Sequence, residues 1–343
     1  MKLTYTTAAL AAAAMMVVSP ATAQVVIVDD SFANGITDGG TGQEIGFATT
    51  SSGAGLDADQ PAGPLDFASG GSGRSIHGLF AAQTLAEFGE SLNVTFSFTT
   101  PDTVAFDNNA VSTNEDFRFG LFDSSTATGN DADTGAAFDF TNNITVSSGT
   151  PQPGLDTVAG FNGEIDNINA PGSDLGIRTH NVNNLAGVGN LSEGEFLNSN
   201  DGFDFITGGT DDLINVTPNT DFIGSLSVAF TDETLTSLDI TVGIADSAGA
   251  IIDSLTTSVA IDDTEDQVGV NTTTFDLLTF HATSGAFGGN DGPIAGSSNT
   301  GEANNGIDIS NVSVTFTPVP EPASLTLLAA GAGLLATRRR KSA

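Results

Sequence analysis

The stretch Ser91-Leu-Asn-Val-Thr-Phe-Ser-Phe98 decides the fold class of this chain. Its apolar residues Leu92, Val94, Phe96 and Phe98 alternate with asparagine, threonine and serine. Successive side chains of a β-strand point to opposite faces, so this alternation predicts a strand with one buried face. The polar face is built from hydroxyl and amide groups rather than charges.

Several other segments either alternate in the same way or are short runs of β-branched and other apolar residues, and together they predict an all-β chain. They are 25–28, 117–122, 175–180, 226–230, 238–244, 251–261, 275–280 and 307–316. The apolar parity shifts between Ile309 and Val312, which indicates a β-bulge. We also expect a strand at 44–50, a hairpin from 137–140 and 144–147, loops at 37–64 and 149–173, and a helical turn at 77–88 as the one helix of the body.

The composition of residues 24–319 is strongly acidic. The chain has 42 acidic residues, and only Glu321 lies outside this region, so 41 acidic residues face three arginines and the net charge is near −38. Such a surface repels nucleic acid and anionic lipid and attracts divalent cations. The 23 phenylalanines all fall in the region, and a body of this size buries about three-quarters of its unfolded surface. We therefore expect one folded domain rather than a disordered acidic stalk. No cysteine is present to form a disulfide.

The two ends of the chain carry export signals. Residues 1–23 combine Lys2, an apolar run and the small-residue site Ala21-Thr-Ala23, which is typical of a secretory signal peptide. At the other end, Val319-Pro320-Glu321-Pro322 precedes the uncharged segment 323–337 and the basic cluster Arg338-Arg339-Arg340-Lys341. A helix of 15 residues covers about 22 Å, short of the roughly 30 Å hydrocarbon core of a bilayer, so the span is marginal. The basic cluster should stay cytoplasmic.

This order of parts resembles the PEP-CTERM protein-sorting signal of Gram-negative bacteria, which exosortase enzymes process. The resemblance implies a signal peptide at 1–23, a β-sandwich body at 24–317 and a sorting signal at 318–343 with a short transmembrane helix. It also implies that Val319, Pro320, Glu321, Pro322, Arg338, Arg339 and Arg340 serve sorting and processing. The expected partners are an exosortase and, transiently, the inner membrane, and the expected destination is the cell surface or the extracellular matrix.

The body resembles a concanavalin A-like or laminin G-like jelly roll. The resemblance rests on SLNVTFSF (91–98), FRFGLFD (117–123), the 235–261 hairpin, FDLLTFHA (275–282) and IDISNVSVTF (307–316). It implies an antiparallel jelly-roll β-sandwich. It also brings glycan binding and glycan cleavage into consideration, since that fold includes lectins and laminarinase-type glycosidases.

No pattern in the body indicates catalysis. Glu164-Ile-Asp166 matches the start of the laminarinase motif, but Ile168 and Asn169 stand where the second acid belongs. Retaining hydrolysis needs two carboxyl groups about 5 Å apart. His77, His180 and His281 are far apart in sequence and show no zinc spacing. The mature chain has neither tryptophan nor tyrosine, the usual rings of sugar sites.

Calcium is the cofactor that the acidic loops favour. Asp131 and Asp133 stand two apart beside Gly135, like the start of a calcium loop, although no glutamate follows at EF-hand distance. Asp29, Asp30 and Asp308 form a second candidate set if the first and last strands are neighbours. Solvated turn residues are the alternative interpretation of both sets.

The sequence thus predicts a non-enzymatic, exported β-sandwich of the cell envelope or extracellular polysaccharide matrix, with no other cofactor and no nucleic-acid partner. A lectin-like or glycan-cleaving jelly roll is the alternative.

We predict that millimolar Ca²⁺ raises the melting temperature more than NaCl of equal ionic strength. A specific site adds about 2.7 kcal/mol at a hundredfold excess of calcium over Kd, whereas NaCl only screens charge. Asp131→Ala with Asp133→Ala should remove the difference if that loop binds, and should keep it if the Asp29 set binds. Circular dichroism follows the melt, and equal shifts with both salts would mean general screening alone.

Overall fold

The structure of the protein is a computed structural model. It describes residues 24–32, 44–51, 65–67, 74–100, 116–127, 139–141, 144–145, 158–166, 171–180, 203–208, 214–217, 219–261, 272–282 and 307–319. Residues Val26–Phe316 form one compact unit. The predicted signal peptide, the segment 323–337 and the basic cluster lie outside the described residues. Within the described residues, no helix is long and apolar enough to cross a membrane.

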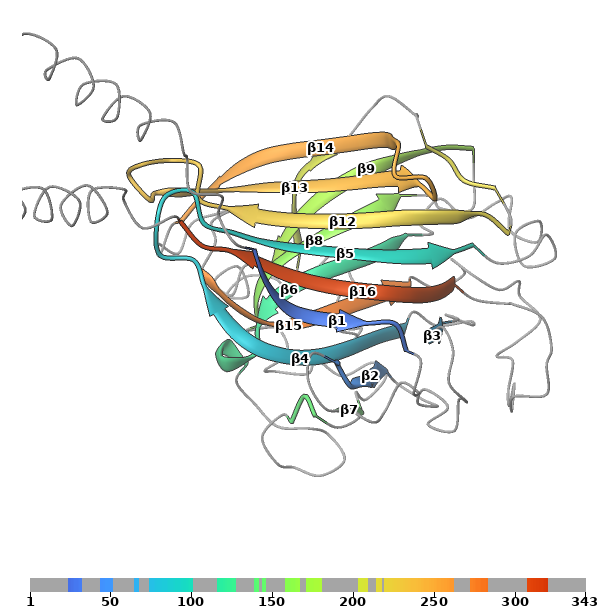
Figure 1. Cartoon of the computed structure of the whole chain (residues 1–343), viewed down its shortest axis with the longest axis horizontal. Helices are drawn as coiled ribbons and strands as arrows, with labels where there is room; N and C mark the ends of the chain where they lie inside the picture. The colour runs from blue at the N-terminus through green and yellow to red at the C-terminus, as the bar shows by residue number, and fades with distance from the viewer. Residues whose placement is uncertain are drawn as a thin grey trace, which may run out of the picture. The chain divides into compact units, whose positions relative to one another are not determined.

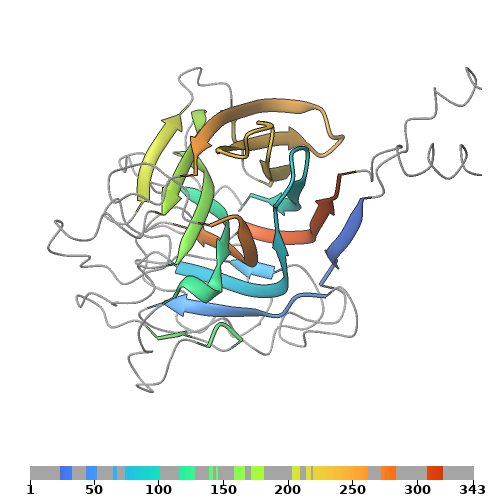
Figure 2. The ribbon, with the colours of Figure 1, turned by 90° about the vertical axis from the view of Figure 1, so that its left-hand side faces the viewer.

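Two β-sheets face each other in this unit (Figures 1 and 2). The seven-stranded sheet has the order β1-β16-β5-β12-β13-β14, with β3 paired to β16. Its strands are β1 (Val25–Asp30), β3 (Leu65–Phe67), β5 (Ser91–Thr99), β12 (Asp221–Ala229), β13 (Ser237–Asp246), β14 (Ile251–Ala260) and β16 (Ile307–Thr317). Strand β5 lies between β16 and β12, so it joins strands that are far apart in sequence.

The nine-stranded sheet has the order β10-β9-β8-β6-β15-β4-β2-β7, with β11 paired to β9. Its strands are β2 (Phe47–Ser51), β4 (Arg74–Thr84), β6 (Phe117–Asp123), β7 (Ile144–Thr145), β8 (Ala159–Asp166), β9 (Pro171–His180), β10 (Phe203–Gly208), β11 (Ile214–Asn215) and β15 (Thr274–Ala282). The strand pairs of this sheet are antiparallel except for β2 with β7, which is parallel. The predicted antiparallel jelly-roll sandwich is therefore confirmed as the fold of the body.

Phenylalanine rings join the two sheets. Phe96 of β5 meets Phe119 and Phe280 at centroid distances of 4.8 and 4.9 Å, and it meets Phe117 at 6.0 Å. All four rings are buried to within 1% exposure. Edge-on aromatic pairs of this kind contribute about 0.5–1.5 kcal/mol beyond the area they bury. The core of the sandwich is thus centred on Phe96.

Two predictions of local structure are wrong. The segment predicted as a helical turn, 77–88, lies mostly in β4, because pairing with β15 and β2 outweighs local helix propensity. The predicted loop at 149–173 contains all of β8 and the start of β9. Strand β8 reads AGFNGEID, and both of its faces are buried, so alternation of apolar and polar residues is absent.

The irregularity in β16 and the turn after β13 agree with the sequence analysis, whereas the predicted hairpin lies partly outside the described residues. The burial of β16 switches parity after Ile309, and Asn311 adopts a left-handed φ of 49°, as expected for the predicted irregularity. The turn after β13 uses Gly249 with φ 84°, where Asp246 accepts from the backbone N–H of Ala248 and Ala250. Of the predicted 137–147 hairpin, β7 is described, and it pairs in parallel with β2.

We predict that Gly224→Ala destabilises the body strongly. Gly224 pairs with Phe96 across β12 and β5, and an added Cβ would lie 2.3 Å from Phe96 Cζ. The ring cannot move without disturbing the aromatic core, so overpacking should cost about 1–3 kcal/mol. Gly243→Ala is the control, because its nearest neighbour is the rotatable hydroxyl of Ser225 at 2.8 Å. Urea denaturation of both variants measures the difference, and equal losses would contradict the prediction.

Candidate functional site

The two faces of the nine-stranded sheet differ in chemistry. Phe117 and Phe119 of β6 face the other sheet, where they contact Phe96. By strand alternation, Arg118 lies on the opposite face. Arg118 is only 2% exposed, so this second face is buried as well, and it is polar. We call it the polar face.

Strand pairing brings a line of polar residues across the polar face. Glu164 of β8 pairs with Arg118 of β6, and Arg118 pairs with His281 of β15. His281 pairs with Ser75 of β4, and on the other side Glu164 pairs with Gly176 of β9. Ser75 and His281 are 206 positions apart in sequence, and only the register of the sheet places these residues in one line.

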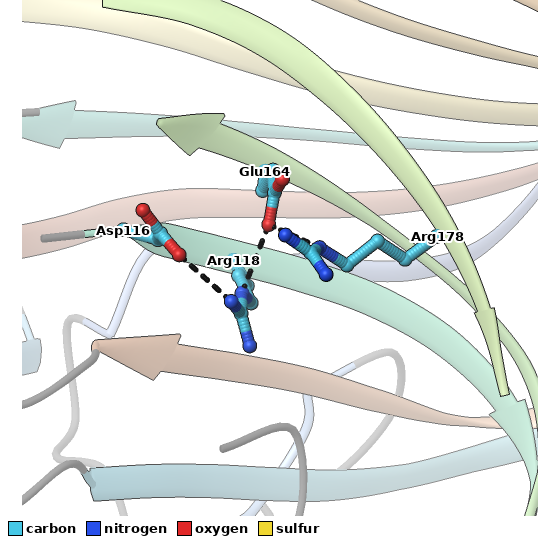
Figure 3. A network of polar contacts seen from close by, with 4 residues as sticks. All are labelled: Asp116, Arg118, Glu164 and Arg178. Carbon is cyan, nitrogen blue, oxygen red and sulfur yellow. Dashed lines mark hydrogen bonds and ion pairs between the residues drawn. The ribbon is translucent and has the colours of Figure 1, made fainter. Parts of the chain in front are cut away.

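Glu164 is the centre of a buried ion network (Figure 3). Its Oε2 accepts hydrogen bonds from Nε of Arg118 at 3.0 Å and from Nε of Arg178 at 2.6 Å. Nη2 of Arg118 also donates to Oδ2 of Asp116 at 2.7 Å. The side chains of Arg118 and Glu164 are each 3% exposed. Buried charges are stable only when they are paired in this way.

Glycine at position 176 makes room for this network. A Cβ added there would lie 2.6 Å from Oε1 of Glu164. The carboxylate therefore occupies the space above Gly176, from which it reaches the arginines of both neighbouring strands. A side chain at 176 would push Glu164 away from them.

A carboxyl group at the end of the network has a pKa raised close to neutral pH. The pKa of Asp166 is raised from 3.8 to about 7, first by burial, then by a hydrogen bond with Asp116 and by the charges of Asp116 and Glu164, while Arg178 opposes the change. Asp166 is only half-buried, so this end of the polar face reaches solvent.

His281 lies beside the network without joining it as an ion. Its Nδ1 is 2.7 Å from Oγ of Ser75, and either atom is the donor, depending on the tautomer. Complete burial lowers the pKa of His281 well below its usual value, and the charge of Arg118 lowers it further. The ring is therefore neutral at pH 7.

Glu164 and Asp166 have partners in the structure that the local sequence motif does not contain. Sequence reasoning found no second acid in the local motif, but strand β6 brings Asp116 against Asp166. Local spacing could not reveal a partner 50 positions away. The carboxylate of Glu164 is occupied by the arginines of both neighbouring strands.

The three histidines lie in strands of the same sheet. His77 in β4 is buried and meets the ring of Phe140 edge-on, with centroids 5.5 Å apart. His180 ends β9. Among the described residues, no group of three or more histidine, cysteine or acidic side chains is placed to hold a metal ion.

The candidate calcium residues fall into two cases. Strands β1 and β16 are neighbours, which the second set required. However, Oδ1 of Asp30 accepts from N–H of Phe32 and Oδ2 from N–H of Ile45, so this carboxylate serves the backbone. Asp29, Asp30 and Asp308 do not form a metal-binding group in the described chain. Asp131 and Asp133 lie outside the described residues, and their calcium site remains a prediction.

Comparison with known proteins identifies the C-terminal signal. The family described as the PEP-CTERM protein-sorting motif matches residues 318–341. The predicted resemblance is thereby confirmed for the tail, which includes the Val319–Pro322 element and the arginine cluster. Apart from Val319, these residues are outside the described structure. No curated protein matches the chain.

Solved structures with similar folds share little sequence with this chain. Winged bean acidic lectin complexed with methyl-alpha-D-galactose is 12% identical, with 87% of this chain and 99% of that chain covered and a TM-score of 0.39. Lectin I-B4 from Griffonia simplicifolia is 15% identical, with 84% and 98% covered and a TM-score of 0.36. An endo-1,3-beta-glucanase from Streptomyces sioyaensis is 13% identical, with 86% and 90% covered and a TM-score of 0.32. These values carry no argument about function.

We predict that Asp166→Asn weakens the pH dependence of stability. A folded pKa of about 7, above the unfolded value of 3.8, means that the native state holds a proton that the unfolded chain releases. The stabilisation is complete below pH 4 and is lost as the pH rises through 7. Melting temperatures of wild type and variant are measured from pH 4 to 8. Below pH 7 the melting temperature of the wild type should fall more steeply with pH than that of the variant, and above pH 7 the two slopes should be equal. Parallel curves over the whole range would contradict this assignment.

Proposed function

We propose that this chain is an exported, non-catalytic β-sandwich protein of the cell envelope or extracellular polysaccharide matrix. The observation that carries the proposal is the sorting motif at residues 318–341. This motif indicates export and sorting by an exosortase. The body would then be the part that remains at the surface after the C-terminal signal has been processed.

The ion network supports a non-catalytic role. A glycosidase nucleophile needs a carboxylate that is free to attack, with an acid about 5 Å away. Glu164 is instead neutralised by two guanidinium groups and is almost fully buried. Its position suits a residue that fixes the register of β6, β8 and β9 better than one that meets a substrate.

The charge of the body supports a place among uncharged polymers. With a net charge near −38 over residues 24–319, the body repels polyanions and other copies of itself. Two of its three arginines are used inside the network, so few cations remain to attract an anionic partner.

We predict that the surface-extracted protein lacks its tail in a host with an exosortase. Cleavage near Pro320–Pro322 should remove the apolar segment and the basic cluster together. Intact-mass measurement in hosts with and without the exosortase gene tests this. The same protein with Arg338, Arg339 and Arg340 replaced by Gln is the control. A mass that still includes residues 323–343 in the host with the enzyme would refute the processing step.

Glycan binding or cleavage is the second candidate function. It is favoured by buried polar atoms of Asn162, Thr279 and His281 on the polar face, which have no hydrogen-bond partner among the described residues. A polysaccharide pull-down with the full chain tests binding, and release of reducing ends tests cleavage. Retention of one polymer without cleavage would replace the purely structural role by a lectin-like one.

A further inference from the structure

Exposed apolar side chains occur at one end of the sandwich. The exposed large hydrophobic side chains among the described residues are Val25, Val26, Phe88, Leu235 and Ile251. Phe88 lies in the loop between β4 and β5, and Leu235 lies in the loop between β12 and β13. Figure 1 shows both loops at the left-hand end of the sheets. Ile251, in contrast, begins β14 at the opposite end of the β13–β14 pair.

The two loops are joined by backbone hydrogen bonds. The N–H of Gly89 donates to the carbonyl of Phe230 at 2.7 Å, and the N–H of Phe230 donates to the carbonyl of Glu90 at 3.0 Å. Figure 2 faces this end of the sheets, and it shows the two loops next to each other. Phe88 and Leu235 therefore belong to one surface, and we call these two residues the apolar tip.

Acidic side chains hold the loops of the apolar tip in shape. Oε2 of Glu90 accepts hydrogen bonds from the N–H groups of Ala86 and Glu87 at 2.6 and 2.9 Å. In the other loop, Oδ1 of Asp232 accepts from the N–H of Thr234 at 3.0 Å. The exposed apolar side chains are thus carried by ordered loops, so contact with a partner costs little conformational entropy.

The backbone at Leu235 does not suit a leucine. Its φ is 54°, a left-handed conformation that favours glycine or asparagine. The side chain is 37% exposed, so burial in the body offers little compensation for this strain. The stability of the body alone does not account for a leucine here, whereas an apolar contact outside the body does.

The sorting signal follows the body at the same end. Figure 1 shows β16 ending beside the loops of the apolar tip. Five residues, 318–322, separate β16 from the apolar segment 323–337. An extended residue spans at most about 3.6 Å, so this linker reaches about 18 Å. When the apolar segment is inserted in the inner membrane, the end of β16 is held within that distance of the lipid.

The apolar segment is too short to let the body stand far from the bilayer. As a helix it covers about 22 Å, against a hydrocarbon core of about 30 Å. The basic cluster at 338–341 resists entry from the other side. Thinning of the bilayer or movement of the flanking residues toward it relieves this mismatch, and both bring the body closer to the lipid.

We propose that Phe88 and Leu235 rest on an uncharged lipid surface while the sorting segment is inserted, and so orient the body on the membrane before processing. The inference rests on the proposed sorting function, because it requires segment 323–337 to enter the membrane. Glu87 and Glu233 are exposed in the same loops and repel anionic headgroups, so a zwitterionic surface fits the tip. Two side chains suffice because the inserted segment makes the contact intramolecular.

Tryptophan fluorescence tests the contact, because the chain has no tryptophan of its own. The protein is purified with its tail from a host without exosortase and inserted into phosphatidylcholine vesicles with brominated acyl chains, which quench tryptophan in the lipid. We expect quenching and a blue-shifted emission for Phe88→Trp and Leu235→Trp. Ile251→Trp is the matched control, because Ile251 is 76% exposed and lies about 30 Å away along the β13–β14 pair.

A fourth variant, Leu328→Trp, reports whether the sorting segment is in the lipid. We expect it to be quenched in the same vesicles. Its emission without quenching would refute membrane entry, and with it both the anchor and the contact. If it is quenched while Phe88→Trp and Leu235→Trp are quenched no more than Ile251→Trp, the contact alone is overturned and the proposed surface role stands.

Two additions to the vesicles identify the partner. Phosphatidylglycerol in place of part of the phosphatidylcholine should weaken the quenching of Phe88→Trp at low salt, whereas stronger quenching would mean an anionic surface and overturn the assignment. Exosortase reconstituted in the vesicles should not be required. A blue shift of Phe88→Trp that occurs only with the enzyme present would assign the tip to a protein partner instead.

Leu235→Asn separates the contact from the fold. Asparagine tolerates the left-handed backbone, so the melting temperature should stay the same or rise. The quenching of Phe88→Trp should decrease when Leu235→Asn is added to the same chain. A lower melting temperature would mean that the leucine serves the fold, and unchanged quenching would mean that it does not touch the lipid. Either result overturns the inference.

Discussion

The contact of Phe96 with three rings of the opposite sheet is the interaction on which the sandwich depends. It joins β5, at the centre of one sheet, to β6 and β15, at the centre of the other. A body that carries about 38 net negative charges repels itself, and general charge interactions oppose its compact state. Burial of apolar area must outweigh that repulsion, and phenylalanine supplies the largest area per residue in a chain without tryptophan. Gly224 belongs to the same arrangement, because its missing side chain gives the Phe96 ring its place.

Two of the three arginines of the body form ion pairs on the polar face of the nine-stranded sheet. In most soluble proteins arginine lies at the surface, but here Arg118 and Arg178 converge on Glu164 beneath the surface. This placement leaves the exterior almost purely acidic. It also keeps the buried carboxylates compensated, with Asp166 holding a proton where the arginines do not suffice. The charge distribution of the whole body and the structure of the network are therefore parts of one arrangement.

The sequence predicts strands well where one face is apolar and the other carries hydroxyl groups. Strands β5, β12 and β13 meet this condition, and their alternation is visible by inspection. Strand β8 and the first part of β4, residues 75–78, do not, because both of their faces are buried and glycine interrupts the pattern. The sorting signal can be recognised from the sequence because its parts are contiguous. The polar face cannot be predicted from the sequence, since Asp116, Glu164 and His281 become neighbours only through strand register.

Stability alone does not explain why the polar face is polar. An apolar set of the same volume usually stabilises a core as well as a buried ion network does, and the network requires every member to be present. The ions could be retained because they fix the register of β6, β8 and β9, since a one-residue slip would separate Glu164 from both arginines. That argument accounts for Arg118, Arg178 and Glu164. It does not extend to Asn162 and Thr279, whose side-chain polar atoms have no hydrogen-bond partner among the described residues. His281 is intermediate, because its Nδ1 is bonded to Ser75 while its Nε2 has no partner there. Apolar residues of the same volume at positions 162 and 279 would avoid the cost of burying polar groups without partners, so stability of the described chain does not account for Asn162 and Thr279.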